Sequence, residues 1–252
     1  MFRRVPDVNS PQPDFPRAFM PHPKLCVPSI IFFIALARAP AEGQTISSPY
    51  SFVEHSKEWA ISVGKSDLNP GQLGLGPRDA TTASGHFGVA FGGAMSFDVD
   101  ATMFLSTRDI LDVSKPVDDR FIGRTDFNIL LTDFKLRLNL TGQRTWRGFQ
   151  PFVIFGGGLA LAAYTDRTLE LATDMSRDEW YEFGTKFTAS FGGGLNYHVS
   201  DRISLRLDGL MNLWKISTPL GWRTVANDPD GTNPEGEWVG IKSFKIGVAW
   251  RL

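Results

Sequence analysis

The stretch FGTKFTASFGGGLNYHVSDRISLRLDGLMNLWK, residues 183–215, decides the fold of this chain. Its apolar residues occupy alternate positions on both sides of the short polar segment 199–202, which is the period of a β-strand rather than of a helix. These apolar positions are Phe183, Phe187, Ala189, Phe191, Leu195, Tyr197, Ile203, Leu205, Leu207, Met211 and Leu213. The stretch therefore predicts one long β-hairpin with an apolar face and a polar face.

Both arms of this hairpin exceed the usual strand length of about 5–6 residues. Long strands with one apolar and one charged face suit a β-barrel that crosses a lipid bilayer, because every backbone polar group in lipid must be paired within the protein. Strand patterns also occur at 59–64, 86–97, 101–108, 121–140, 149–164 and 239–252, with a bulge expected at 129–131 and a tight turn at 98–100. We therefore predict an all-β fold, a single eight-stranded antiparallel up-and-down transmembrane barrel.

The connections between these strands alternate in length, as they do in small bacterial outer-membrane barrels. Long loops are expected at 66–84, 110–120, 165–181 and 217–238, with some helical character in 165–180. Short turns lie at the opposite end, which is the periplasmic end in such barrels. We expect the loops 66–84, 165–181 and 217–238 to be the surface contact sites.

The small and polar face of the strands is predicted to line the lumen, because eight strands enclose a space only just wide enough for side chains. The predicted lumen charges are Asp133, Lys135, Arg137, Lys186, Arg206, Asp208, Lys245 and Arg251. Buried charges of both signs must pair, so we expect an ion network that plugs the barrel rather than a conducting pore. Two interfacial tryptophan belts are expected, one of Trp59, Trp146 and Trp250 and the other of Trp180, Trp214 and Trp238.

Composition excludes several other classes of function. The chain holds 26 Lys+Arg and 27 Asp+Glu, a balance that provides no basis for nucleic-acid binding. Its single cysteine, Cys26, excludes an internal disulfide framework and a cysteine-based metal site. No cofactor is predicted.

The N-terminal region is interpreted as an export signal. Residues 27–37, VPSIIFFIALA, form an apolar core after Lys24, and Ala39 and Ala41 provide an A-x-A cleavage pattern. The predicted organisation is an extension and cleavable signal peptide over 1–41, with Met20 as an alternative start, a periplasmic linker over 42–56, and the barrel over 57–252. The alternative interpretation is that 30–36 form a buried core strand.

The segments PFVIFGGGLALAAY, FGGGLNYHVSDRISLRLDGL and FKIGVAWRL resemble the small OmpA- and opacity-like outer-membrane barrels of Gram-negative bacteria. The hairpin motif is carried by Gly192, Gly194, Tyr197, Leu205, Arg206 and Asp208. The resemblance implies an outer-membrane location among lipid and lipopolysaccharide, insertion by the barrel-assembly machinery, and a monomer. One departure is Leu252 at the C-terminus, where the family usually ends in an aromatic residue.

No catalytic, cofactor-binding or metal-binding residues are assigned. His198, Ser200 and Asp208 are the three residue types of a Ser–His–Asp catalytic triad. However, His198 and Ser200 flank a turn at the periplasmic end. His86 lacks a serine partner. The loop with Asp228, Asp230 and Asn233 lacks the full spacing of a calcium loop.

The predicted role is structural or surface-interacting through an unknown ligand at the loops. The alternatives are a lipid-A-modifying enzyme and transport of small hydrophobic molecules through a lateral opening.

Overall fold

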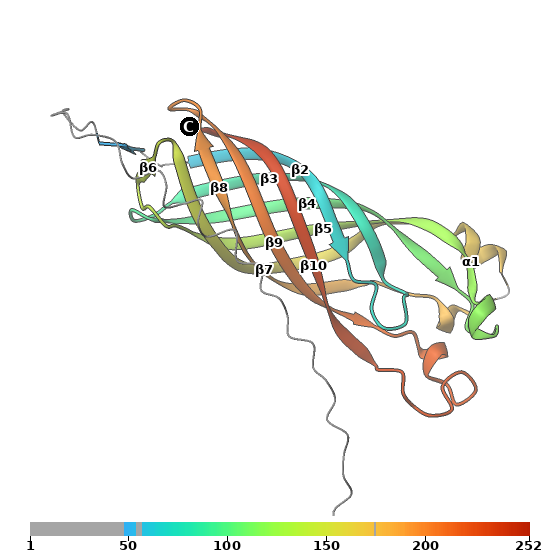
Figure 1. The fold of residues 1–252 in the computed structure, drawn as a ribbon. Helices are drawn as coiled ribbons and strands as arrows, with labels where there is room; N and C mark the ends of the chain where they lie inside the picture. The colour runs from blue at the N-terminus through green and yellow to red at the C-terminus, as the bar shows by residue number, and fades with distance from the viewer. Residues whose placement is uncertain (1–47, 54–56, 174) are drawn as a thin grey trace, which may run out of the picture. The chain divides into compact units, whose positions relative to one another are not determined.

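The computed structural model describes residues 48–53, 57–173 and 175–252. Within them, eight long strands form a closed antiparallel barrel in which each strand pairs with the next along the chain and the last pairs with the first (Figure 1). The strands are β2 Lys57–Leu68, β3 Pro77–Ala90, β4 Met95–Leu111, β5 Phe121–Asn139, β7 Phe149–Thr165, β8 Thr185–His198, β9 Ile203–Ser217 and β10 Gly236–Arg251. The predicted fold class is confirmed. The predicted signal segment, 1–41, lies outside the described residues.

The long connections carry the few helical turns. These are α1 Thr168–Ala172 and the 3₁₀ turns η2 Val117–Asp119, η3 Arg177–Glu179 and η4 Leu220–Arg223. Figure 1 shows α1 and the long loops at one end of the barrel, and the C-terminus and β6 at the other. The predicted helical character of 165–180 is confirmed. The predicted alternation of long and short connections holds for most of the chain, but 140–148, which contains β6, is as long as 112–120 and longer than 69–76. None of the helices in the described residues is long and apolar enough to cross a membrane.

A short pair of strands lies beside the tight-turn end and was not predicted. Strand β1, Tyr50–Phe52, pairs antiparallel with β6, Arg144–Trp146, which interrupts the turn between β5 and β7. The pairing is extended on both sides, because the N–H of Arg147 donates to the carbonyl of Pro49 and the N–H of Val53 to that of Gln143, both at 2.9 Å. Residues 48–53 of the predicted linker are therefore attached to the barrel's turn.

The outer wall of the barrel is apolar. Outward side chains of the hairpin that predicted the fold are exposed, with Phe187 80% exposed, and so are those of the last strand, with Phe244 62% exposed. Arg206, Asp208 and Lys245 of the same strands point inward and are buried, whereas Lys215 and Lys242 are exposed. This distribution is the reverse of that of a soluble barrel and is the one a bilayer requires.

The predicted turn at 98–100 is wrong. Strand β4 runs straight through these positions, and the turn lies at 91–94, where Gly92 and Gly93 have positive φ angles of 72° and 63°. Asp98 and Asp100 resembled turn residues by type, but they are inward strand residues whose carboxylates face cations across the lumen. Their burial is described with the site below.

The predicted loop over 66–84 is largely strand. The connection covers only 69–76, because β3 begins at Pro77. The outward residues in the first half of β3, Thr81, Ala83 and Gly85, are small. This part of the sequence therefore lacks the apolar alternation that marks the other strands. The predicted bulge is confirmed, because the register between β5 and β7 shifts between Asn128 and Ile129.

Two aromatic residues predicted to face outward face inward instead. Trp214 is fully buried, and so is Phe183, which precedes β8 and is separated from it by Gly184 with a φ of 63°. Trp214 is therefore not part of an interfacial belt. Trp59, Trp146, Trp238 and Trp250 are exposed as predicted, whereas Trp180 is partly buried in the loop that holds η3.

Close approach of the strands explains one of the glycine clusters. A Cβ added at Gly158 would collide with the carbonyl oxygen of Thr132 and lie 2.7 Å from Oδ1 of Asp133. Gly158→Ala is expected to lower the free energy of unfolding by about 1–3 kcal/mol through overpacking. Urea unfolding in lipid vesicles, followed by gel mobility, measures this change. Gly85→Ala is the matched control, because nothing lies within 4 Å of its added Cβ; equal loss in both variants would contradict the prediction.

Candidate functional site

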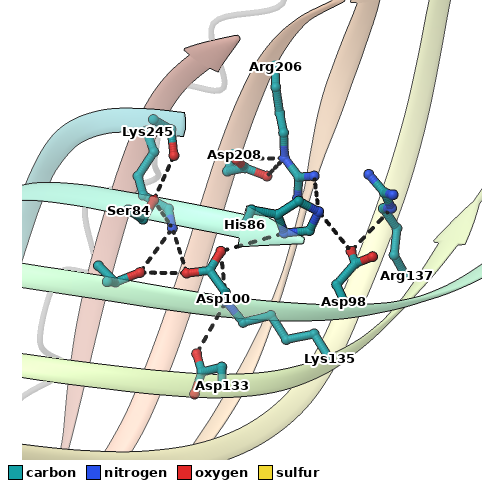
Figure 2. A network of polar contacts seen from close by, with 12 residues as sticks. Ser84, His86, Asp98, Asp100, Asp133, Lys135, Arg137, Arg206, Asp208 and Lys245 are labelled. Atoms are coloured by element: carbon teal, nitrogen blue, oxygen red, sulfur yellow. Dashed lines mark hydrogen bonds and ion pairs between the residues drawn. The ribbon is translucent and has the colours of Figure 1, made fainter. Parts of the chain in front are cut away.

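The lumen near the tight-turn end is filled by a network of charged side chains (Figure 2). Its members are Glu58, His86, Asp98, Asp100, Asp133, Lys135, Arg137, Arg206, Asp208 and Lys245, and all of them are buried. They come from β2, β3, β4, β5, β9 and β10, where each occupies an inward position of the two-residue strand period. The closed barrel therefore brings together charges that are far apart in the sequence.

One half of the network is built on two arginines. Oε1 of Glu58 accepts from Nη1 of Arg137 at 2.7 Å and from Nη1 of Arg206 at 3.4 Å. Nε of Arg137 lies 3.2 Å from Oδ2 of Asp98, and Nε of Arg206 lies 2.9 Å from Oδ1 of Asp208. Each guanidinium is thus placed between carboxylates of different strands, which is the fork geometry that arginine suits.

The other half is built on two lysines. Nζ of Lys135 lies 3.2 Å from Oδ2 of Asp133 and 3.7 Å from Oδ2 of Asp100. Nζ of Lys245 lies 3.6 Å from Oδ1 of Asp100 and donates to Oγ of Ser84 at 3.1 Å. Asp100 therefore bridges the two ammonium groups.

His86 joins the two halves. Its Nε2 lies 3.2 Å from Nη1 of Arg206, and its Nδ1 lies 3.8 Å from Oδ2 of Asp100. Because a guanidinium only donates hydrogen bonds, Nε2 is the acceptor and the ring is neutral in this arrangement. The imidazole is a buried structural link that lies between Arg206, Asp98 and Asp100 in Figure 2.

An aromatic ring closes this charged layer from one side. The guanidinium carbons of Arg137 and Arg206 lie 5.7 and 4.9 Å from the centroid of the Phe152 ring. Phe152 packs with Ile154 and Leu210 in a small apolar cluster. Cation–π contact adds to the ion pairs and leaves little free space between them.

The lumen near the long-loop end is apolar, which sequence reasoning missed. The buried cluster there consists of Leu68, Leu75, Ala80, Phe104, Val113, Phe127, Ile129, Leu131, Ala160, Tyr181, Phe183, Trp214, Ile216, Trp222, Val239 and Ile241. The Trp214 ring meets those of Phe104 and Phe183 edge-on, with centroids 6.5 and 5.3 Å apart. The prediction of a polar lumen is correct only for the tight-turn half.

Polar contacts hold the long loops over this apolar layer. Nη2 of Arg108 in β4 pairs with Oε1 of Glu170 in α1 at 2.6 Å, and both side chains are buried. The same guanidinium lies 5.7 Å from the ring centroids of Phe127 and Tyr181. Trp222 of η4 donates from Nε1 to the carbonyl of Glu179 at 3.2 Å. Two loops and one strand are thereby held together.

Most of the predicted lumen charges are found in the network. Asp133, Lys135, Arg137, Arg206, Asp208 and Lys245 are buried there as predicted. The other two are partly exposed: Lys186 donates to Oγ of Ser217 at 3.0 Å, and Arg251 contacts His198. Glu58, Asp98 and Asp100 were missed, although Asp98 and Asp100 each lie between apolar residues, at the inward phase of β4.

The structure does not bring His198, Ser200 and Asp208 together as a catalytic triad. His198 contacts Gln150 at 3.1 Å, whereas Asp208 is bound to Arg206 inside the lumen. The Ser200 hydroxyl accepts from the N–H groups of Arg202 and Ile203, at 3.4 and 3.1 Å, and so caps its own turn. These three residues therefore form no nucleophile–base–acid arrangement.

The acidic loop is folded around one of its own carboxylates. Asp228 accepts from the N–H groups of Thr232 and Asn233, each at 2.9 Å. The hydrogen bond from Asn233 holds the pKa of the Asp228 carboxyl below its usual value. Its oxygens are used for turn formation, and no group of three or more potential metal ligands occurs among the described residues.

Comparison with known proteins identifies the fold. No family model matches the sequence, and no curated protein matches it. The structure is similar to the outer membrane protein OprG from Pseudomonas aeruginosa, with a TM-score of 0.52 and 14% identity over 79% of this chain and 98% of that one. It is also similar to Neisserial surface protein A, NspA (TM-score 0.45, 14% identity, 81% and 98% covered), and to Ail of Yersinia pestis (0.39, 12%, 78% and 99%). The fold is therefore that of the small outer-membrane barrels.

Proposed function

We propose that this chain is an outer-membrane barrel with a sealed lumen, and that it acts through its long loops in a structural or surface-interaction role. The observation that carries the proposal is the filling of the lumen on two levels, by the ion network around Arg137 and Arg206 and by the apolar layer around Trp214. Ligands can reach the two ends of a barrel filled in this way, but they cannot pass through its lumen.

The outer wall supports the membrane part of this proposal. Trp59, Trp146 and Trp250 are exposed near the tight-turn end, and Trp238 is exposed near the long-loop end. Such aromatic girdles mark the two interfaces of outer-membrane barrels. The long-loop end would then face outward from the cell, with lipid and lipopolysaccharide around the wall.

The long loops carry exposed apolar side chains at their tips. Val225 is 84% exposed and Leu171 71% exposed, and Val117 and Leu220 are also exposed. Exposed loops held on a rigid scaffold are common sites of interaction. The contact sites are thus 112–120, 166–184 and 218–235, and the connection 69–76 replaces most of the loop first predicted at 66–84.

The two alternatives find less support. A lipid-A-modifying enzyme needs a nucleophile and a base together near the long-loop rim, but His86 is enclosed in the ion network and His198 lies at the tight-turn end. Transport of small hydrophobic molecules through a lateral opening needs an empty apolar lumen beside that opening, but the apolar half of this lumen is filled by packed side chains such as Phe104, Phe183 and Trp214. The first proposal therefore remains the one that the geometry favours.

The sealed lumen predicts that the refolded protein will show no large steady conductance in planar lipid bilayers. The ion pairs and aromatic rings leave no continuous water path, so only brief, small current fluctuations are expected. A general porin inserted into the same bilayer provides the positive control, and gel mobility confirms that the inserted protein is folded. Uniform, long-lived conductance steps would contradict the sealed lumen.

A further inference from the structure

The ribbon that β1 and β6 form at the tight-turn end (Figure 1) has one open edge. Among the described residues β1 pairs with β6 alone. The hydrogen bonds that extend this pairing use the carbonyl of Pro49 and the N–H of Val53. Because hydrogen-bonded and non-hydrogen-bonded pairs alternate along an antiparallel ladder, the backbone groups of Tyr50 and Phe52 point away from β6.

These outward backbone groups are available to another strand. The carbonyl of Tyr50 and both backbone groups of Phe52 have no partner in the part of the chain that the structure describes. The N–H of Tyr50 donates to Oγ of Ser48 at 3.3 Å. An exposed strand edge of this kind is a template for pairing. A strand can therefore add to β1 without breaking a bond between β1 and β6.

The side chains on the outer face of the ribbon are of the types that bind proteins. Tyr50 lies opposite Trp146, and Phe52 lies opposite Arg144. The three aromatic side chains are exposed, Phe52 by 64%. Aromatic residues and arginine are enriched in protein interfaces and contribute most of their binding energy. This face therefore has the composition of a protein contact surface.

A strained turn places a second arginine on the same face. Arg147 and Gly148 join β6 to β7 with φ angles of 51° and 84°, and Arg147 is the only non-glycine residue with a positive φ in the described ranges. Such two-residue turns favour Asn at the first position. The turn holds the guanidinium of Arg147 5.4 Å from the centroid of the Trp146 ring. Strain of this kind is common where a side chain must be presented for binding.

The outer face of the ribbon is basic. Neither Arg144 nor Arg147 has a carboxylate oxygen within 4.0 Å among the described residues. The ribbon segments 48–53 and 141–149 contain no Asp or Glu. Asp201 lines a hollow together with Ser51 and Thr145, which are on the opposite face of the ribbon. The two guanidiniums are therefore free to pair with an acidic partner.

We propose that an extended acidic segment of a periplasmic protein binds here by adding a strand to the open edge of β1. Its backbone pairs with Tyr50 and Phe52, and its acidic side chains contact Arg144 and Arg147. Main-chain bonds give affinity in this mode of recognition, and side chains give specificity. A lipid headgroup could use the charge but not the edge, because it has no N–H and C=O groups at strand spacing. The site goes beyond the proposed function, which uses the long loops.

Fluorescence anisotropy with a labelled hexapeptide of alternating valine and glutamate tests the proposal, using the folded full chain in detergent micelles. The peptide is expected to bind. Replacing its glutamates by glutamine should weaken binding about tenfold, because the ion pairs are lost. Methylating its alternate backbone nitrogens on the edge that faces β1 should weaken binding about tenfold as well, because the charge stays but the strand pairing is lost.

Variants of the protein test the same two contributions. Phe52→Pro removes the N–H that faces the added strand but no bond to β6, and it should bind about tenfold more weakly, whereas Phe52→Ala keeps that N–H and should lose less. Arg144→Gln combined with Arg147→Gln should also bind about tenfold more weakly. Lys215→Gln is the matched control, because it removes an exposed cation at the long-loop end and should leave binding unchanged.

The outcomes that overturn the site are distinct. No binding of the peptide by the unaltered protein would overturn it, and so would equal binding of the methylated peptide, since charge alone would then be the cause. Displacement of the peptide by an equal concentration of phosphatidylglycerol would assign this face to lipid instead. Outer-membrane fractionation tests the proposed function separately, because the peptide measurement needs only the folded chain.

Discussion

Glu58→Ala is expected to lower the free energy of unfolding by about 3–5 kcal/mol, because removing one partner leaves buried charge uncompensated. The Glu58 carboxylate is the shared acceptor of Arg137 and Arg206, at 2.7 and 3.4 Å. Both guanidiniums are buried among protein atoms, so water cannot replace the lost carboxylate freely. Urea unfolding in lipid vesicles, followed by tryptophan fluorescence, measures the change.

Glu58→Gln separates charge from shape at the same position. The amide keeps an oxygen that can accept from Arg137, so a smaller loss than in Glu58→Ala is expected. Asp79→Ala removes an exposed carboxylate from the outer side of β3 and is expected to leave stability unchanged. A Glu58→Ala protein that unfolds at the same urea concentration as the Asp79→Ala control would show that the network contributes nothing to stability.

The strands with bulky outward residues could be predicted from the sequence. In 183–215 the exposed Phe187 and Leu205 alternate with buried Ser190 and Arg206, and the period of two follows directly from strand geometry. The barrel followed from eight such patterns joined by alternating long and short connections. Local periodicity is enough here, because the bilayer and the lumen impose opposite polarity on the two faces of every strand.

The first half of β3 could not be predicted in this way. Its outward residues Thr81, Ala83 and Gly85 are small, so neither face shows a clear polarity. Asp98 and Asp100 were misread for a different reason, since aspartate is common in turns and only the opposite strand reveals their partners Arg137 and Lys135. In both cases the decisive information lies in cross-strand contacts, which the linear sequence does not contain.

The apolar half of the lumen did leave a signal in the sequence. Ile129, Leu130 and Leu131 are consecutive apolar residues, and the structure shows Ile129 and Leu131 buried inside the barrel with Leu130 on the outer side. Trp214 shares the inward phase of Asp208 and Asn212. A strand that is apolar on both faces over its loop-proximal part indicates an apolar lumen at that level.

The two-level filling explains how the loops and the barrel are connected. The ion network fixes the strands to one another near the tight-turn end, where the connections are short. Near the other end the connections are long, and Trp222 and Tyr181 from these connections enter the apolar layer of the lumen. The loops are therefore ordered by burial of their aromatic residues and by the buried ion pair of Arg108 with Glu170.

Breaking that ion pair is expected to release the loop 166–184. Glu170→Ala leaves the buried guanidinium of Arg108 without its carboxylate, which predicts a loss of about 3–5 kcal/mol in the free energy of unfolding. The loop contains Arg167 and Arg177 as trypsin sites, so its release should also increase the rate of tryptic cleavage there. Cleavage of folded protein in vesicles, followed by mass spectrometry of the fragments, measures this rate.

A double replacement decides whether the loss comes from the ion pair or from packing. Arg108→Met combined with Glu170→Met removes both charges and keeps apolar volume beside the rings of Phe127 and Tyr181. Because a well-packed apolar pair can replace a buried ion pair at little or no cost, the double variant should recover most of the stability and resist trypsin. If it is cleaved as fast as Glu170→Ala, apolar packing cannot replace the ion pair, and the loop is held by the charged contact itself. If Glu170→Ala itself resists trypsin, the loop is held by its aromatic residues, and the ion pair with Arg108 does not hold it in place.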